Sequence, residues 1–295
     1  MRTTTALNGS KLLVRKLGER RVWRKLLRER LNEPLHLNLA AGAVAIFGNY
    51  RSKVEWDLIV RPHYAYGVLH AAEQARIAGL SAVTVIEFGV AKGERLLNLC
   101  DLAKKTEQCT GIRIEVVGFD SGMGMPEPLD YRDHPELYSL GDFPMDQEKL
   151  KRALPAGAEL KIGALSETLD AFLAERHAPV GFAAIDVDYY SSTRDALRLF
   201  ADADVSKYVA VPLLYFDDIM FETHNEWSGE LLAINEFNAA QSSRKIALDR
   251  FLPTRRIFRN ARWLRQIYVL HLFDHPWRSS LKRRREVAAL ENLYL

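Results

Sequence analysis

The stretch AAIDVDYYSST (183–193) places two carboxylates, Asp186 and Asp188, at the end of an apolar run and directly before a segment with helical periodicity. A buried carboxylate is costly unless it is paired, protonated or bound to a metal. A second acidic pair, Asp217 and Asp218, closes the apolar run LLYFDD (213–218). Side chains two residues apart on a strand point to the same face, so Asp186 and Asp188 can serve one site. The two acidic pairs therefore indicate a chemical function.

Short apolar runs alternate along the chain with amphipathic segments, which is typical of a parallel sheet covered by helices. Strands are expected at 83–90, 112–120, 158–164, 181–188 and 213–218, with two more in RKIALDRFL and RQIYVLHLF. Helices are expected at 63–78, in GERLLNLCDLAKKTEQ, and in SETLDAFLAER, SSTRDALRLFADA and GELLAINEFNAAQ. The pattern predicts an α/β fold with a doubly wound, mostly parallel sheet.

Three residues mark element boundaries. Ser192 and Asp195 have the spacing of a capping box, which predicts that a helix begins at Ser192 with its positive end toward the carboxylates. Pro212 cannot donate a hydrogen bond inside a central strand, so the strand is expected to start after it.

The segment 121–146 is too long for a simple connection, and it is rich in Gly, Pro and aromatic residues. We expect a lid or a substrate wall, with Tyr131, Asp133 and His134 as candidate contacts. His224 could be a second base or a substrate ligand, but a histidine in a surface loop is the favoured explanation.

The composition of the 295 residues, 48% hydrophobic and 27% charged, suits one large domain with appendages. The expected division is a basic, partly helical N-terminal extension (1–60), an α/β domain (61–277) and a basic C-terminal tail (278–295). No uncharged apolar run reaches the roughly 18 residues of a membrane span. Cys100 and Cys109 fit neither a disulfide framework nor a zinc pattern, which indicates a reducing, cytoplasmic location.

The net charge of +3 hides basic ends and an acidic middle. Residues 1–35 carry ten Lys or Arg against three Asp or Glu, and residues 250–295 carry eleven against three. These ends could contact a membrane surface or an anionic partner, or they could be solvated helices beside the acidic middle. No recognition motif for nucleic acid accompanies these basic ends, so we do not expect the chain to bind nucleic acid. The apolar stretch LHLNLAAGAVAIFGNY is expected to be buried, and a homo-oligomer is possible.

A glycine-rich turn follows the first expected strand. IEFGVAKG contains Glu87, Gly89, Ala91 and Gly93, and small residues in such a turn let the backbone approach a ligand closely. The turn lacks the spacing G-x-G-x-x-G, which disfavours a dinucleotide-dependent oxidoreductase. The next strand ends in GFD, where the carboxylate of Asp120 can accept both hydroxyls of a ribose. Together these features favour the binding of a nucleoside.

The motifs IEFGVAKG, GFDSGMGMPEP, GALSETL, DVDYYSST and YFDD, in this order, resemble those of class I S-adenosylmethionine-dependent methyltransferases. Within that class, the segment 83–218 is most similar to the macrocin O-methyltransferase family. The resemblance implies that the cofactor S-adenosyl-L-methionine is bound by Glu87, Gly89, Ala91, Gly93, Asp120, Ser121, Ala164 and Leu165. It also implies that Mg²⁺ or another divalent cation is held by Asp186, Asp217 and Asp218, and that Asp188 is the general base.

Three functions follow as hypotheses. The first is a metal-dependent O-methyltransferase that acts on a hydroxyl of a small polyhydroxylated molecule, such as a sugar unit or a natural product. The second is a metal-dependent glycosyltransferase that uses DVD as a D-x-D motif, which leaves IEFGVAKG and FDD unexplained. The third is a methyltransferase-like protein without activity that docks through its basic ends.

Overall fold

The computed structural model describes residues 30, 32–220 and 223–279, and these fall into two compact units. One unit combines the chain up to Ile59 with Arg250–Arg265, and the other combines Val60–Asp249 with the chain from Gln266 onward. Residues 250–265, which the sequence assigns to the α/β domain, therefore group with the N-terminal segment. Most of the basic leader and of the basic tail lies outside the described residues.

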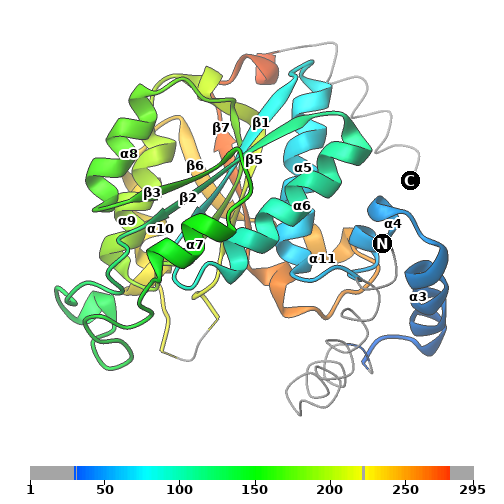
Figure 1. The fold of residues 1–295 in the computed structure, drawn as a ribbon, viewed down its shortest axis with the longest axis horizontal. Helices are drawn as coiled ribbons and strands as arrows, with labels where there is room; N and C mark the ends of the chain where they lie inside the picture. Colours follow the sequence, from blue (N-terminus) through cyan, green and yellow to red (C-terminus); the bar gives the residue numbers. More distant parts are fainter. Residues whose placement is uncertain (1–29, 31, 221–222, 280–295) are drawn as a thin grey trace. The chain divides into compact units, whose positions relative to one another are not determined.

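The larger unit is built on a seven-stranded sheet (Figure 1). Its strands are β1 (Ala82–Phe88), β2 (Arg113–Asp120), β3 (Ala158–Ile162), β4 (Val180–Ile185), β5 (Tyr208–Phe216), β6 (Arg244–Leu248) and β7 (Ile267–Leu272). The strand order is β3-β2-β1-β4-β5-β7-β6; the first five strands are parallel, and β7 is antiparallel to both of its neighbours. This is the strand order of the class I methyltransferase fold, so the predicted fold class is confirmed.

Helices cover both faces of the sheet. One face carries α5 (Pro62–Ile77) and α6 (Glu94–Thr110), and the other carries α8 (Leu165–Ala174), α9 (Tyr190–Leu197) and α10 (Gly229–Ala240) (Figure 1). The short α7 (Gln147–Ala153) precedes β3, and short 3-10 helices lie at Tyr131–Asp133, Arg198–Ala201, Val205–Lys207 and Pro276–Ser279. The helix α5 lies close to β4 because Gly67 faces the ring of Phe182, where a Cβ would come within 2.3 Å of ring carbons.

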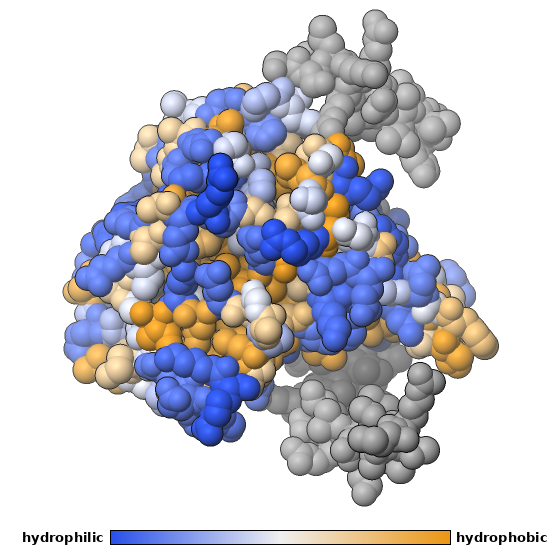
Figure 2. All heavy atoms as spheres, turned by 45° about the horizontal axis from the view of Figure 1, so that its top comes forward, coloured by the Kyte–Doolittle hydropathy of each residue, from blue (hydrophilic) through white to orange (hydrophobic). Residues whose placement is uncertain are grey.

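The core follows from the apolar runs in the sequence. Every residue of β1 and of β4 is buried, because both strands lie inside the sheet and are covered on both faces. Polar and charged residues cover much of the face shown in Figure 2, and hydrophobic residues gather there in a few patches.

Pro212 lies inside β5, so the expectation that the strand starts after it is wrong. The register between β4 and β5 shifts at this point, since Val180 pairs with Tyr208 whereas Phe182 pairs with Leu213. The extra residues of β5 form an irregularity in which the missing N–H of proline costs no ladder bond.

The smaller unit contains α3 (Leu35–Phe47), α4 (Tyr50–Glu55), α11 (Leu252–Arg255) and a 3-10 helix at Arg262–Arg265. Its two chain segments are joined by a buried ion pair, in which a guanidinium nitrogen of Arg256 lies 2.6 Å from the carboxylate of Asp57. Arg256 also donates to the carbonyl oxygens of Val54 and Glu55. Removing one partner of such a pair leaves a buried charge uncompensated, so the pair ties residues 250–265 to the N-terminal segment.

The helix α3 is exposed, which corrects the expectation that this apolar stretch is buried. Of its residues only Ala41 is buried, whereas Leu39, Ile46 and Phe47 are 69%, 74% and 85% exposed. The apolar side chains of α3 lie on all faces of the helix. A small unit has too little interior to bury all of them. Among the described residues, no helix is both long and apolar enough to cross a membrane.

The helix α9 begins at Tyr190, so the predicted capping box is wrong. Ser192 lies within the first turn, and the N-terminal groups are bound instead by Asp133 from the long loop. The carboxylate of Asp133 accepts from the backbone N–H of Ser191 at 2.8 Å and from the hydroxyl of Ser191 at 2.9 Å. It also accepts from the backbone N–H of Leu129 at 3.0 Å. A distant residue thus provides the cap that the sequence assigned locally.

We expect Asp133→Ala to lower the free energy of unfolding by about 1–3 kcal/mol, because three hydrogen bonds to a buried carboxylate are lost. Urea denaturation measures the change. The control is Asp101→Ala, since Asp101 is exposed on α6 and pairs with exposed Lys105; its effect should stay within about 0.5 kcal/mol. Equal effects of the two substitutions would contradict the assignment of Asp133 as the cap.

Candidate active site

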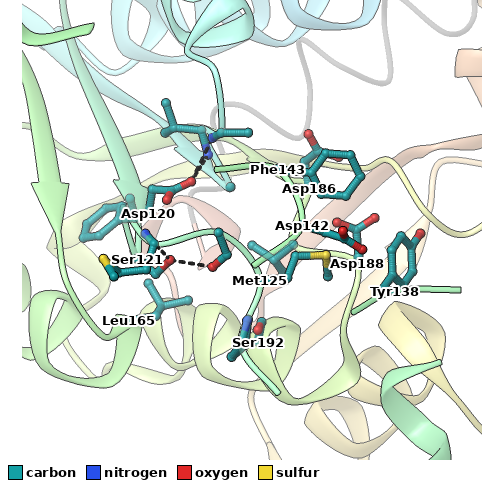
Figure 3. A pocket seen from close by; sticks show the side chains of 18 of the residues that line it. Asp120, Ser121, Met125, Tyr138, Asp142, Phe143, Leu165, Asp186, Asp188 and Ser192 are labelled. Carbon is teal, nitrogen blue, oxygen red and sulfur yellow. Dashed lines mark hydrogen bonds between the residues drawn. The ribbon is translucent and has the colours of Figure 1, made fainter. Parts of the chain in front are cut away.

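A pocket of about 1150 Å³ opens at the carboxyl edge of the parallel strands, where ligands bind in open α/β sheets. The volume exceeds the ~300–1,000 Å³ typical of a site for one drug-sized ligand. Ten predicted site residues line it: Gly89, Ala91, Asp120, Ser121, Ala164, Leu165, Asp186, Asp188, Asp217 and Asp218. Figure 3 shows Asp120, Ser121 and Leu165 toward one end, Asp186 and Asp188 toward the other, and Met125 between them. The pocket is therefore large and has two chemically different ends.

Asp120 organises the first end of the pocket. One of its carboxylate oxygens accepts from the backbone N–H groups of Val90 and Ala91, both at 2.8 Å, and the other accepts from Gly122 at 2.7 Å (Figure 3). These bonds tie the turn after β1 to the end of β2. The oxygen that accepts from Gly122 has a second acceptor position, so Asp120 can also accept a hydrogen bond from a hydroxyl group of a ligand.

Gly89 makes the close approach of two strand ends possible. Its φ is +83°, and a Cβ there would lie 1.8 Å from the carbonyl oxygen of Asp186. The backbone N–H of Asp186 donates to Phe88 at 3.0 Å, so the chain after β4 passes directly beside this turn. A glycine at position 89 therefore brings the turn after β1 and the carboxylates after β4 into one pocket.

The carboxylates of β4 and β5 meet at the second end of the pocket, as the sequence predicted. Asp186, Asp217 and Asp218 offer one oxygen each, and these three atoms lie within 4.8 Å of one another. Asp188 has a φ of +57°, a left-handed conformation that aspartate tolerates better than most residues. Like charges at this spacing repel, so the cluster requires a proton or a cation.

One cation is already in the cluster. The guanidinium of Arg95, the second residue of α6, forms an ion pair with Asp186 and a second one with Asp217 at 3.1 Å. Asp217 also accepts a hydrogen bond from Tyr215. Two of the three carboxylates that could hold a metal are thus bound by side chains of this chain.

A shared proton relieves the remaining repulsion. Asp188 and Asp218 are hydrogen-bonded to each other, and Asp188 also bonds to Tyr138 from the long loop. Burial raises the pKa of Asp188, and burial together with the charges of Asp188 and Asp217 raises the pKa of Asp218 to about 9. The pair therefore holds one proton at neutral pH and can accept a second one from a ligand.

Glu230 extends this cluster into the protein interior. It is 1% exposed at the start of α10, and its carboxylate accepts from the backbone N–H of Asp218 at 3.0 Å. Burial and the charge of Asp218 raise the pKa of Glu230 well above its ordinary value. Glu230 thus acts on the site through Asp218 and does not line the pocket.

Glu87 and Gly93, the other two predicted cofactor residues, are not among the lining residues. Glu87 is fully buried in β1 and accepts a hydrogen bond from Tyr64 at 2.9 Å. Burial raises its pKa from 4.5 to about 8, although Tyr64 and Arg95 act in the opposite direction. Gly93 faces Leu150 of α7. Both residues are buried, on either side in the sequence of Gly89 and Ala91, which line the pocket.

The long loop forms a wall of the pocket, as the sequence predicted. The residues that line the pocket are not the ones that the sequence analysis named as candidate contacts. Met125, Tyr138 and Phe143 line the pocket, whereas Tyr131, Asp133 and His134 do not. Asp133 anchors the loop to α9, and the ring of buried His134 stacks on that of His224 at 4.5 Å. His224 likewise does not line the pocket.

The sequence reasoning missed Arg95, Tyr138 and Glu230. Arg95 carried one signal, because a cation in the first turn of a helix opposes the helix dipole and therefore calls for a reason. Glu230 carried none, since an acidic residue is ordinary in that position. Tyr138 lies in irregular structure, where no periodicity indicates which side chain points inward.

No family model and no curated protein matches the chain. Among solved structures, the calicheamicin methyltransferase CalS11 is similar at 21% identity over 68% of this chain and 82% of its own, with a TM-score of 0.44. The O-methyltransferase NovP is 17% identical over 60% and 72%, with a TM-score of 0.44. An O-methyltransferase from Bacillus cereus in complex with SAH is 13% identical over 72% and 80%, with a TM-score of 0.37. The chemistry of the site therefore has to come from its own residues.

The raised pKa of Glu87 predicts a dependence of stability on pH. The folded state keeps the proton of Glu87 up to about pH 8, whereas the unfolded state releases it near pH 4.5. The free energy of unfolding should therefore fall by as much as about 5 kcal/mol as the pH rises between these values. Glu87→Gln, which stays neutral, should therefore gain stability relative to the unmodified chain as the pH rises from 5 to 8. Urea denaturation at several pH values measures the difference. Exposed Glu127→Gln is the control, and an equal gain for it would contradict the prediction.

Proposed function

We propose that the chain is an S-adenosylmethionine-dependent O-methyltransferase that acts on a hydroxyl of a small polyhydroxylated acceptor, such as a sugar unit or a natural product. The observation that carries the proposal is one continuous pocket with two different ends. A carboxylate suited to a ribose lies at one end, and a carboxyl pair that can take a proton lies at the other. The motif resemblance supports the same activity.

The cofactor end is formed by three elements. The turn at Gly89 and Ala91 presents backbone to the ligand, Asp120 and Ser121 offer acceptors for the ribose hydroxyls, and the start of α8 at Leu165 adds an apolar wall. Met125 of the long loop lies opposite and is almost fully buried. A polar edge and apolar walls together fit a nucleoside with a thioether or sulfonium chain.

The acceptor end positions a base. When bound, S-adenosylmethionine supplies an electrophilic methyl group. Asp188 would take the proton of the acceptor hydroxyl as the oxygen attacks that methyl carbon and the carbon–sulfur bond breaks, leaving S-adenosylhomocysteine. The raised pKa of Asp188 strengthens it as a base, since proton transfer is efficient when the pKa of the base approaches the working pH.

The proposed function does not include the predicted Mg²⁺, because only part of the site suits a divalent cation. The donor atoms of Asp186, Asp217 and Asp218 are close enough together and chemically suitable. Arg95, however, is paired with two of these carboxylates. With Arg95 in this position the donors do not suit a divalent cation, and we derive no step through one.

We expect isothermal titration calorimetry to detect binding of S-adenosylhomocysteine and not of uridine diphosphate. The reverse result would favour the glycosyltransferase, which binds a nucleotide sugar. Binding of S-adenosylhomocysteine without methyl transfer to any hydroxylated acceptor would favour the protein without activity.

Asp188→Asn should lower methyl transfer from labelled S-adenosylmethionine by about 10²–10⁴-fold, because a neutral amide cannot accept the proton. Binding of S-adenosylhomocysteine should be retained, since Asp188 lies at the acceptor end. Asp195→Asn is the control, because Asp195 lines the same pocket on α9 outside the carboxylate cluster. Turnover by Asp188→Asn at the level of this control would exclude Asp188 as the base.

A second property is proposed for α3, which is association with an anionic lipid surface. Its exposed apolar residues have no interior to enter, and the sequence directly before the helix carries ten Lys or Arg against three Asp or Glu in residues 1–35. Apolar side chains beside a run of basic residues bind the interface of anionic membranes.

Vesicles containing phosphatidylserine should therefore sediment the full chain, and vesicles of phosphatidylcholine alone should not. Leu39→Asp combined with Phe47→Asp should weaken the binding at least about tenfold. Leu140→Asp is the control, since Leu140 is 66% exposed and lies outside α3. If the chain does not bind vesicles but forms a dimer that the α3 variant abolishes, α3 instead contacts a second copy of the chain.

A further inference from the structure

Arg95 occupies the centre of the acidic end of the pocket. Its two terminal guanidinium nitrogens contact different strands, one at Asp186 after β4 and the other at Asp217 after β5. The side chain is 36% exposed and lines the pocket, so it faces bound ligands and is not part of the core. A guanidinium matches this task because its nitrogens form a rigid planar fork.

Arg95 binds two of the three carboxylates that a divalent cation would need. Asp186 and Asp217 are two of the three residues whose oxygens come within 4.8 Å of one another, and no other group of this kind exists among the described residues. The positive charge also acts on Glu87, Asp188 and Asp218, whose pKa values it lowers against the effect of burial. One side chain therefore neutralises part of the charge of the cluster.

The position of Arg95 in its own helix supports a specific role. It is the second residue of α6, where the helix dipole disfavours a positive charge. Lys92 and Arg194 also line the pocket, but Arg194 pairs with Asp195, outside the carboxylate cluster, and Lys92 forms no ion pair with the cluster. In α6 this local preference is opposed by the two carboxylates that face the side chain.

We propose that Arg95 is the built-in cation of this site, which positions Asp186 and Asp217 and excludes a divalent metal ion. The acceptor end then works without a metal cofactor, and Arg95 is a positioning residue that acts through the two carboxylates. The last step rests on the proposed methyltransferase function, whereas the exclusion of a metal ion does not.

Titration of the metal-free full chain with Mn²⁺, followed by the electron paramagnetic resonance of the free ion, tests the proposal directly. The unmodified chain should show no binding below millimolar Mn²⁺. Arg95→Gln should bind Mn²⁺ at least about tenfold more tightly, because one positive charge beside the donors is removed. Arg194→Gln is the matched control, since it removes a charge from the same pocket without touching the cluster, and it should leave Mn²⁺ binding unchanged.

Binding of Mn²⁺ to the unmodified chain at micromolar concentration would overturn the proposal, whatever the variants do. Equal affinity of the unmodified chain and Arg95→Gln for Mn²⁺ would overturn it as well. Arg95→Met replaces the glutamine variant if that variant does not fold.

Binding of S-adenosylhomocysteine by each variant shows that the pocket is intact. If the chain transfers methyl groups, turnover should persist in ethylenediaminetetraacetate. A chain that never transfers a methyl group would refute the proposed function and leave the Mn²⁺ result standing.

Discussion

Like charges converge at the carboxyl ends of β4 and β5, and the surrounding structure is arranged to hold them together. The parallel sheet forces this convergence, because neighbouring strands end at the same edge. Three means of compensation act at once: the guanidinium of Arg95, a proton shared by Asp188 and Asp218, and hydrogen bonds from Tyr138 and Tyr215. Because their charges are compensated in this way, the carboxylates can remain close together at the edge of a ligand pocket.

The same constraint explains why the long loop is fixed in place. Its Tyr138 bonds to Asp188, so the loop has to be anchored for that bond to form reliably. Asp133 provides the anchor by capping α9, the helix that follows Asp188 in the chain. The long loop is thus bonded both to the start of α9 and to Asp188. These bonds let a segment without regular secondary structure form a wall of the pocket.

Most strands and helices were predictable because apolar runs and helical periodicity are local properties of the sequence. The meeting of Asp186 with Asp217 and Asp218 was predictable too, since parallel strands place their ends together. Three expectations were wrong for reasons that no local pattern shows. The cap of α9 comes from Asp133 in a distant loop, Pro212 is tolerated by a register shift, and the apolar α3 has no interior to enter. Arg95 was missed because its partners lie more than ninety residues away in the sequence.

A guanidinium and a divalent metal ion would give this site different chemistry. A metal ion polarises a bound hydroxyl directly and lowers its pKa, whereas a guanidinium can only donate hydrogen bonds and neutralise charge. With Arg95 as the cation, removal of the acceptor proton depends more strongly on the base. Burial, with the charge of Asp217 as a smaller contribution, raises the pKa of Asp188 and so favours proton uptake. In the proposed mechanism Arg95 holds Asp186 and Asp217 in position while Asp188 takes the proton, so the internal cation and the base are two parts of one arrangement.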